Sequence, residues 1–414
     1  MAFSKSITDL KKQALEKTRP YFEQLDEISQ INTERVLNAY SQSQISESHF
    51  QETTGYGYGD AGREKLDEVW ANICGAEKAL VRPQFVSGTH ALSCVLFGIL
   101  RPGDELLSVT GVPYDTMQTV IGQVRQTKGS LTETGIVYRE IPMTESGVDI
   151  EGLEKHITPN TKMLLIQRSR GYSLRKPLSI NEIKKICARA HEIKNDVICF
   201  VDNCYGEFVD ILEPTSVGAD IMAGSFIKNP GGGIAPGGGY IAGSEELVEL
   251  AACRLTAPGL GSSLGSAVAG RRLFFQGIFL APHVVNQALK GAIFTAALFN
   301  LLGYKVTPGF DEARHDIIQA IELKSAEKML AFCRGLQKYS PIDAYVTPIP
   351  GDMPGYKDQV IMAGGTFIQG SSIELSADGP LRKPYIIYVQ GALAFEHAVL
   401  GALGAAEAIN NIKN

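Results

Sequence analysis

Two short apolar runs that each lead to a charged residue constrain the fold of this chain most strongly. The run 197–201 leads directly into Asp202, and the run 221–225 is followed by Lys228. A short apolar run bounded by turn-forming residues is typical of a strand buried inside a parallel sheet. Ligands of such sheets bind outside the carboxyl ends of the strands. We therefore expect Asp202 and Lys228 to face the same crevice.

The residues around this pair favour a cofactor site. An amine and a carboxylate in one crevice suit pyridoxal phosphate, which needs a lysine for its Schiff base and an acid that keeps its pyridine nitrogen protonated. A buried salt bridge between Asp202 and Lys228 is the alternative. It explains poorly the run NPGGGIAPGGG after Lys228, because these glycines suit a backbone that turns tightly and passes close to a ligand.

The composition is that of an ordinary globular protein, with 44% hydrophobic and 20% charged residues in a chain of 414. The net charge of -6 lacks the basic footprint of a protein that binds nucleic acid or an anionic membrane. No signal peptide or uninterrupted apolar run of about 18 residues is present, so we expect a cytoplasmic protein. The seven cysteines and seven histidines are scattered without a metal or disulfide spacing, so no catalytic metal is expected.

The strand and helix patterns divide the chain into three parts. Residues 1–55 begin with a charged helical pattern and become polar, which we interpret as an N-terminal arm. Residues 56–303 alternate strands with amphipathic helices, which predicts a large α/β domain with a mostly parallel, doubly covered sheet. Residues 304–414 carry the strand patterns YKVTP, QAIEL, DAYVTPIP, TFIQGSSIELS and PYIIYVQ with helices at 326–336 and from about 392, which predicts a smaller α+β domain.

Two further segments supply candidates for the same crevice. The turn VSGT opens a helix, and N-H groups at a helix N-terminus beside a glycine and hydroxyls form an anion site, so Ser87, Gly88 and Thr89 are candidate phosphate ligands. Simple helix capping is the alternative. Tyr114 follows the strand pattern 105–110 and is either a stacking partner for a flat cofactor ring or a half-buried loop tyrosine.

The loop RSRGYSLR follows the strand pattern 162–167. We interpret Arg168 and Arg170 in this loop as solvated side chains. A contact with an anion is the weaker alternative for both arginines.

The sequence resembles the fold type I pyridoxal-phosphate enzymes, and within them the carbon-sulfur lyases related to cystathionine beta-lyase and methionine gamma-lyase. The resemblance is greatest to the group of aluminium resistance proteins. It is carried by YGYGDAGREKLDEVWA, VSGTHAL, VDNCYGEFVD, SFIKNPGGGIAPGGGYIAG and ELSADGPLRKPYIIYVQGAL. It implies a lyase that cleaves the carbon-sulfur bond of a sulfur-containing amino acid to give a thiol, ammonia and a 2-oxo acid.

The resemblance also implies roles for single residues. Lys228 would form the Schiff base and act as the base for the alpha proton, Asp202 would pair with the pyridine nitrogen, and Tyr114 would stack on the ring. Arg382 is similar in placement to the arginine that binds the substrate carboxylate, with an ordinary surface arginine as the alternative. The phosphate would be held by Ser87, Gly88, Thr89 and Ser225.

Related lyases carry a tyrosine and an arginine one residue apart that reach the phosphate across a two-fold interface. Here the candidates are Tyr56, Tyr58 and Arg63, and the sequence does not choose between them. The resemblance thus implies a homodimer or homotetramer with shared active sites. A glycine-rich surface loop is the alternative interpretation of TTGYGYGDAGR.

Other functions remain open at this point. Transaminase, racemase and aldolase chemistry use the same cofactor, and a non-catalytic protein can also bind it. A nucleotide-binding protein is a further alternative, although neither GxxxxGK[ST] nor GxGxxG occurs between a strand pattern and a helix pattern.

Overall fold

The computed structural model describes residues 3–124, 127–144, 147–267, 270–353 and 358–412. Its larger sheet has seven strands in the order β1-β7-β6-β5-β4-β2-β3. Strands β2 to β6 run parallel, whereas β7 is antiparallel to its neighbours β6 and β1. The expected mostly parallel sheet is confirmed. The strands are β1 (Lys78–Arg82), β2 (Glu105–Ser108), β3 (Val137–Glu140), β4 (Thr161–Gln167), β5 (Ile198–Asp202), β6 (Ile221–Ser225) and β7 (Gly239–Gly243).

Helices cover both faces of this sheet. Alternate residues of β5 show the two faces, since Phe200 lies in one hydrophobic core and Val201 in the other. Burial on both faces explains why the strand sequences are continuous apolar runs. One face packs against α3 (Gly88–Ile99), α4 (Asp115–Ile121) and α7 (Glu245–Leu255), and the other against α2 (Ala61–Cys74), α6 (Ile180–Ile193) and α8 (Arg271–Leu301), with α5 (Leu153–His156) beside α6.

The smaller domain is built on an antiparallel sheet of five strands in the order β10-β11-β12-β9-β8. The helices α9 (Ala326–Gln337) and α10 (Phe395–Asn410) pack together and share its hydrophobic core. The patterns YKVTP, QAIEL and PYIIYVQ contain β8, β9 and β12. The strands are β8 (Lys305–Thr307), β9 (Ile318–Glu322), β10 (Val360–Ala363), β11 (Ser376–Pro380) and β12 (Ile386–Gln390).

Two expected strands of this domain were wrong. The segment DAYVTPIP is irregular, because Pro348 and Pro350 have no N-H to donate to a sheet and Asp343 has a left-handed φ of 55°. Most of TFIQGSSIELS is also irregular. The carboxylate of Glu374 accepts hydrogen bonds from the backbone N-H groups of Phe367 and Ile368, which folds this segment back on itself before β11 begins.

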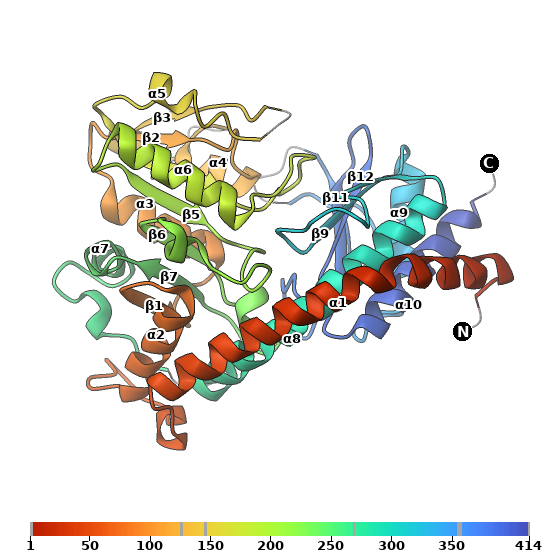
Figure 1. Cartoon of the computed structure of the whole chain (residues 1–414), viewed down its shortest axis with the longest axis horizontal. Helices are drawn as coiled ribbons and strands as arrows, with labels where there is room; N and C mark the ends of the chain where they lie inside the picture. The colour runs from red at the N-terminus through yellow and green to blue at the C-terminus, as the bar shows by residue number, and fades with distance from the viewer. Residues whose placement is uncertain (1–2, 125–126, 145–146, 268–269, 354–357, 413–414) are drawn as a thin grey trace.

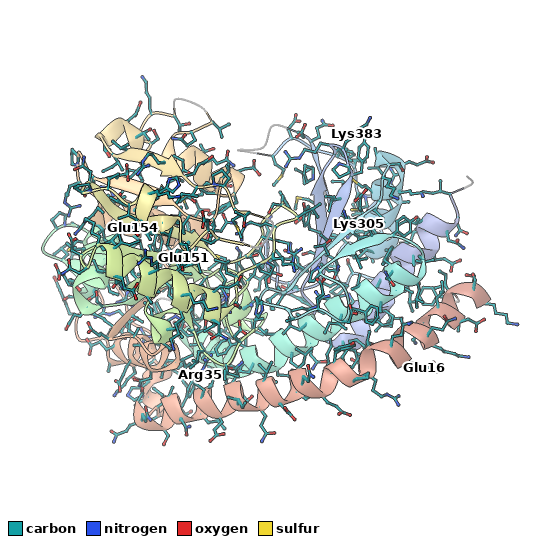
Figure 2. All side chains as sticks on the ribbon, turned by 45° about the horizontal axis from the view of Figure 1, so that its top comes forward. Glu16, Arg35, Glu151, Glu154, Lys305 and Lys383 are labelled. Carbon is teal, nitrogen blue, oxygen red and sulfur yellow. The ribbon has the colours of Figure 1, made fainter. Side chains whose placement is uncertain are left out.

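The N-terminal residues form one helix that contacts both domains. Helix α1 (Lys5–Gln42) has 38 residues and runs beside α8 under the two domains (Figure 1). Ile7 lies in the core of the small domain, and Val36 lies in the core of the large domain. Figure 2 shows Glu16 and Arg35 of α1 beside the small and large domains, respectively. The expected arm is therefore a helix that braces the two domains.

Helix α8 is long and apolar enough, by length and composition, to cross a membrane. Its most apolar window is 78% buried inside the protein. Phe274, Ile278 and Val285 of this helix lie in the core beneath the larger sheet. A central place in the core therefore accounts for the apolar composition of α8.

Candidate active site

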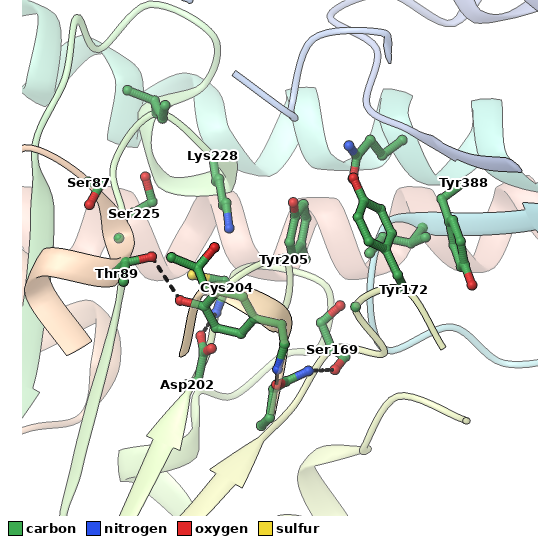
Figure 3. Close-up of a pocket in the computed structure, with 18 of the residues that line it drawn as sticks. Ser87, Thr89, Ser169, Tyr172, Asp202, Cys204, Tyr205, Ser225, Lys228 and Tyr388 are labelled. Carbon is green, nitrogen blue, oxygen red and sulfur yellow. Dashed lines mark hydrogen bonds between the residues drawn. The ribbon is translucent and has the colours of Figure 1, made fainter. Parts of the chain in front are cut away.

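A cavity of about 310 Å³ opens where the parallel strands of the larger sheet end. Gln167, Asp202 and Ser225 are the last residues of β4, β5 and β6, and all three line it. The small domain contributes further residues, including Asp378 and Tyr388. Figure 3 shows side chains of both domains around this space. The cavity is thus formed by the carboxyl edge of the sheet and closed by the second domain.

Asp202 and Lys228 both line this cavity. Oδ1 of Asp202 accepts a hydrogen bond of 3.1 Å from the backbone N-H of Cys204, which fixes the carboxylate at the end of β5. Burial raises the pKa of Asp202, and the charge of Lys228 opposes that rise. Burial lowers the pKa of Lys228, but Cys204, Tyr205 and Asp202 outweigh it, so the pKa of Lys228 lies well above its ordinary value.

The N-terminus of α3, where the sequence predicts an anion site, lies at the cavity. Oγ of Ser87 accepts a hydrogen bond of 3.1 Å from the N-H of His90, so this hydroxyl does cap the helix. A Cβ added to Gly88 would lie 2.9 Å from Cβ of Ser225, so only glycine lets the helix end approach the end of β6 this closely. Ser87, Gly88, Thr89 and Ser225 all line the cavity. Together they provide N-H groups and hydroxyls that suit a phosphate.

Tyr114 is anchored to two of its neighbours. Its hydroxyl lies 2.9 Å from Oγ1 of Thr89, and its backbone N-H donates to Oε1 of Gln167 at 2.9 Å. Nε2 of Gln167 donates in turn to the carbonyl of Ser169 at 3.0 Å. Burial raises the pKa of the Tyr114 hydroxyl. Tyr114 is therefore held between Thr89 at the start of α3 and Gln167 at the end of β4, with its hydroxyl neutral.

The small domain closes the opposite wall of the cavity. Asp378 of β11 stands opposite Tyr388 of β12 in the sheet, and both residues line the space. Nε2 of Gln390 donates to Oδ2 of Asp378 at 3.2 Å. Burial raises the pKa of Asp378 to about 6. The rings of Tyr172 and Tyr388 lie 5.2 Å apart, so this wall combines one acid with two aromatic rings.

Four of the candidate residues lie outside the cavity lining. Tyr56 and Tyr58 are 67% and 75% exposed, whereas Arg63 is buried and donates to the carbonyl of Gly57 at 2.8 Å. Arg382 is half exposed on the turn between β11 and β12 and pairs with Asp358 at 3.2 Å. It borders a neighbouring hollow that shares Tyr114 and Tyr172 with the cavity.

The interpretation of Arg168 and Arg170 as solvated side chains was wrong. Both are fully buried. Nη1 of Arg168 donates to Oδ1 of Asn203 at 2.8 Å, and Nη1 of Arg170 donates to the carbonyl of Thr307 at 2.9 Å. Carboxylates offset the cost of burying the two charges, since Arg168 pairs with Asp210 at 2.6 Å and Arg170 with Asp316 at 3.5 Å. Arg168 thus holds the turn after Asp202, and Arg170 ties the large domain to the small one.

Sequence reasoning missed several residues of the lining. Gln167 ends a strand pattern, so the rule that found Asp202 could have found it. Cys204 and Tyr205 follow Asp202 directly and could have been included as its turn. Tyr172 lies in the loop RSRGYSLR after β4 and could have been included with Gln167, whereas Asp378, Tyr388 and Gln390 carry no such signal, because they reach the cavity only through the packing of the two domains.

The sequence matches the family described as methionine gamma-lyase over residues 7–411. The chain belongs to this family. An uncharacterized Bacillus subtilis protein, YnbB, is 52% identical over 90% of this chain and 89% of its own length. A carbon-sulfur lyase involved in aluminium resistance from Clostridium novyi is 49% identical, with a TM-score of 0.95 over 98% of this chain and 96% of its own. A candidate cystathionine beta-lyase involved in aluminium resistance from Listeria monocytogenes is 50% identical, with a TM-score of 0.95 over 97% of this chain and 100% of its own.

Enzymes of this family have fold type I and depend on pyridoxal phosphate, and the cavity fits that cofactor. It offers an amine, a buried carboxylate, an aromatic ring and a helix N-terminus around one space. The close approach of Gly88 to Ser225 leaves backbone N-H groups beside a hydroxyl, as an anion requires. The residues present therefore match each chemical part of the cofactor.

Proposed function

We propose that this protein is a pyridoxal-phosphate-dependent lyase that cleaves the carbon-sulfur bond of a sulfur-containing amino acid. The products would be a thiol, ammonia and a 2-oxo acid. The observation that supports this proposal most strongly is that Lys228, Asp202 and the N-terminus of α3 surround one cavity in a chain of the methionine gamma-lyase family. Similarity to the carbon-sulfur lyase of Clostridium novyi supports the same class of reaction.

The residues that would hold the cofactor follow from the site. Lys228 would bind it covalently, Asp202 would pair with its pyridine nitrogen, and Tyr114 would lie on its ring. When bound, pyridoxal phosphate supplies an electron sink for charge that develops at the alpha carbon of an amino acid. The phosphate would be held by Ser87, Gly88, Thr89 and Ser225.

The protein's own groups would then orient the substrate and move its proton. Nζ of Lys228 is the base that takes the proton from the alpha carbon, because it is the amine of the cavity lining and lies within that buried space. The carboxylate of Asp202 must be ionised to hold a protonated pyridine nitrogen, and the positive charge of Lys228 already favours that form. Tyr172, Tyr205 and Tyr388 line the space and limit the access of water.

Arg382 remains our candidate for the substrate carboxylate, although it stands beside the cavity. It would have to leave Asp358 and turn inward past Tyr172. Arg382→Leu should raise KM for the amino acid and leave the cofactor absorbance unchanged. An unchanged KM would assign carboxylate binding to another group.

The residues Tyr56, Tyr58 and Arg63 lead us to propose a homodimer at least. They do not line the cavity of their own chain among the residues described, so a role at the phosphate requires a second copy of the chain. The two tyrosines are exposed and their ring centres lie 5.4 Å apart, which suits a surface that meets a partner. In a two-fold symmetric dimer, this segment of each subunit would reach the cavity of the other subunit.

The reaction class is tested with cystathionine, cysteine and methionine as substrates. The thiol and the 2-oxo acid are measured separately, with Lys228→Ala as the inactive control. Equal amounts of both products support the proposal. A 2-oxo acid without a thiol, or racemised amino acid, would indicate other chemistry on the same cofactor. Bound cofactor without turnover of any of the three substrates would favour a binding protein.

A further inference from the structure

A second cluster of chemically versatile side chains lies at the other end of β5. His191 of α6, Cys199 of β5 and Asp220, which directly precedes β6, place one ligand atom each within 4.8 Å of one another. Asp202 ends the same strand at the cavity, whereas Cys199 is the second residue of the strand. The cluster is therefore separate from the site described above and is not needed for its chemistry.

The backbone and hydrogen bonds hold these three side chains together. Oδ2 of Asp220 lies 3.0 Å from Nε2 of His191 and accepts a hydrogen bond of 2.7 Å from the N-H of Cys199. The backbone N-H of Asp220 donates to the carbonyl of Cys199 at 3.0 Å. Helix α6, strand β5 and the residue before β6 thus deliver an imidazole, a thiol and a carboxylate to one point.

A fourth donor lies next to the cluster. Cys187 stands one turn before His191 on α6, so both side chains are on the same face of that helix. Its thiol is buried near Cys199 but lies outside the group of three ligand atoms, so a bound ion would have to draw this sulfur inward. Two sulfurs, one imidazole nitrogen and one carboxylate oxygen are all ligand types that zinc takes, and four of them suit its tetrahedral coordination. The scattered sequence positions 187, 191, 199 and 220 hid this set from the spacing rules.

We propose that Cys187, His191, Cys199 and Asp220 bind one Zn²⁺ ion. Imidazole and thiolate donors select zinc over magnesium and calcium, which require oxygen ligands. The side chains of His191 and Asp220 are about one-third exposed, which gives the ion a path from solvent, while both sulfurs are buried. On binding, each thiol loses its proton to solvent and each sulfur forms a bond to the metal, so no oxidation or reduction occurs.

The ion would act as a structural clamp between α6, β5 and β6. With Cys187 as the fourth ligand, protein side chains would fill all four positions, which is the arrangement of structural zinc sites rather than catalytic ones. The ordinary alternative is an ion pair between His191 and Asp220 with two buried cysteines beside it. The two readings differ in metal uptake, which can be measured without any reference to lyase activity.

The test uses the full-length protein carrying its cofactor, stripped with a chelator and dialysed against one equivalent of Zn²⁺ or Co²⁺. We expect one bound zinc per chain, a higher melting temperature with zinc, and visible cobalt absorption bands of a tetrahedral site with thiolate ligands. Cys199→Ser should lose these signals, and Cys187→Ser should weaken binding at least tenfold. Cys333→Ser, a buried cysteine in the small-domain core, is the matched control and should bind as wild type does.

His191→Gln provides a second test in case a cysteine variant does not fold. The side chain of His191 is partly exposed, so we expect this substitution to leave the core and the fold intact. Loss of zinc binding in His191→Gln supports the site. Less than about one-tenth of an equivalent of zinc on the wild type would overturn the proposal, as would unchanged uptake by Cys199→Ser or His191→Gln.

Discussion

Nζ of Lys228 lies 4.0 Å from the centre of the Tyr205 ring. Tyr205 has a left-handed φ of 71°, which is uncommon for a bulky residue, and this conformation belongs to the turn that follows Asp202. The ring face attracts the ammonium group, and Cys204 and Tyr205 raise the pKa of Lys228 against the lowering effect of burial. The turn that carries Tyr205 therefore helps to set both the position and the charge of the amine.

Lys228→Ala should abolish covalent binding of the cofactor. The purified wild type is expected to be yellow, with a visible absorbance band that borohydride removes, because the link to the amine is reducible. The variant should lack the band. Lys305→Ala, which removes an exposed lysine, is the control and should keep it. A colourless wild type after growth with pyridoxine would contradict the proposed cofactor.

Asp202→Asn should keep the covalent link but lose activity. The amide removes the charge that holds the pyridine nitrogen protonated, at a cost of about 1.5–3 kcal/mol for a hydrogen bond to a charged group. We expect kcat to fall on the order of 10²-fold or more, since the charge is needed most when electrons move into the ring. The visible spectrum reports the link, and steady-state kinetics report the loss. Near-normal rates would make Asp202 a structural residue only.

Tyr114→Phe should weaken the hold on the cofactor without preventing folding. The change removes one neutral hydrogen bond, to Thr89, worth about 0.5–1.5 kcal/mol. Cofactor affinity should therefore fall by about two- to tenfold, as measured by titration of the stripped protein. Tyr345→Phe removes a hydroxyl from an exposed ring and should change nothing. A loss no larger than in that control would mean that Thr89 does not depend on Tyr114.

Glu207 should make stability fall as pH rises. Its side chain is fully buried, and Oε1 accepts a hydrogen bond of 2.7 Å from the hydroxyl of Tyr240. Burial raises the pKa of Glu207 from 4.5 to about 8, against the lowering effect of that hydrogen bond. Because the folded state holds the proton more tightly than the unfolded state, its stabilising effect is complete below pH 4.5 and is lost as pH rises to about 8.

Glu207→Gln removes this titration and is the test of it. The melting temperature of the variant should depend less on pH between 5 and 9, with a gain over wild type at the alkaline end of roughly 1–3 kcal/mol, the cost of a buried group without a partner. Glu154→Gln alters an exposed carboxylate and should follow the wild-type curve. Parallel curves for wild type and Glu207→Gln would show that Glu207 is ionised throughout this range.

The parts of the site that lie at strand ends could be predicted from the sequence. A buried parallel strand is recognisable as an apolar run, and ligands bind at the residue where such a strand ends. Asp202 was predicted in this way, Lys228 from the turn after the next apolar run, and the Ser87 turn from the start of a helix pattern. Asp378 and Tyr388 were not, since they come from another domain and no local pattern fixes how two domains dock. Arg168 was misread for a related reason, because its partners Asn203 and Gly206 lie on another segment. The brace formed by α1 was also missed, since a largely polar helix can still bury single residues such as Ile7 and Val36 at opposite ends.

Mixing two inactive variants should restore activity if active sites are shared between subunits. One chain carries Lys228→Ala, and the other carries Tyr56→Ala and Tyr58→Ala, two changes at exposed positions that leave the core intact. A second version adds Arg63→Ala, kept separate because Arg63 also donates a hydrogen bond to the carbonyl of Gly57.

In a hybrid dimer, one site has both defects and the other has neither. With random exchange half of the dimers are hybrids, so about a quarter of the wild-type activity should return.

The control is Lys228→Ala mixed with a second Lys228→Ala chain that carries a distinguishable tag, and this mixture should stay inactive. If hybrids form, as shown by co-purification of the tags, and activity does not return, the tyrosines serve their own chain or none. A single-chain species by sedimentation would exclude the shared site directly.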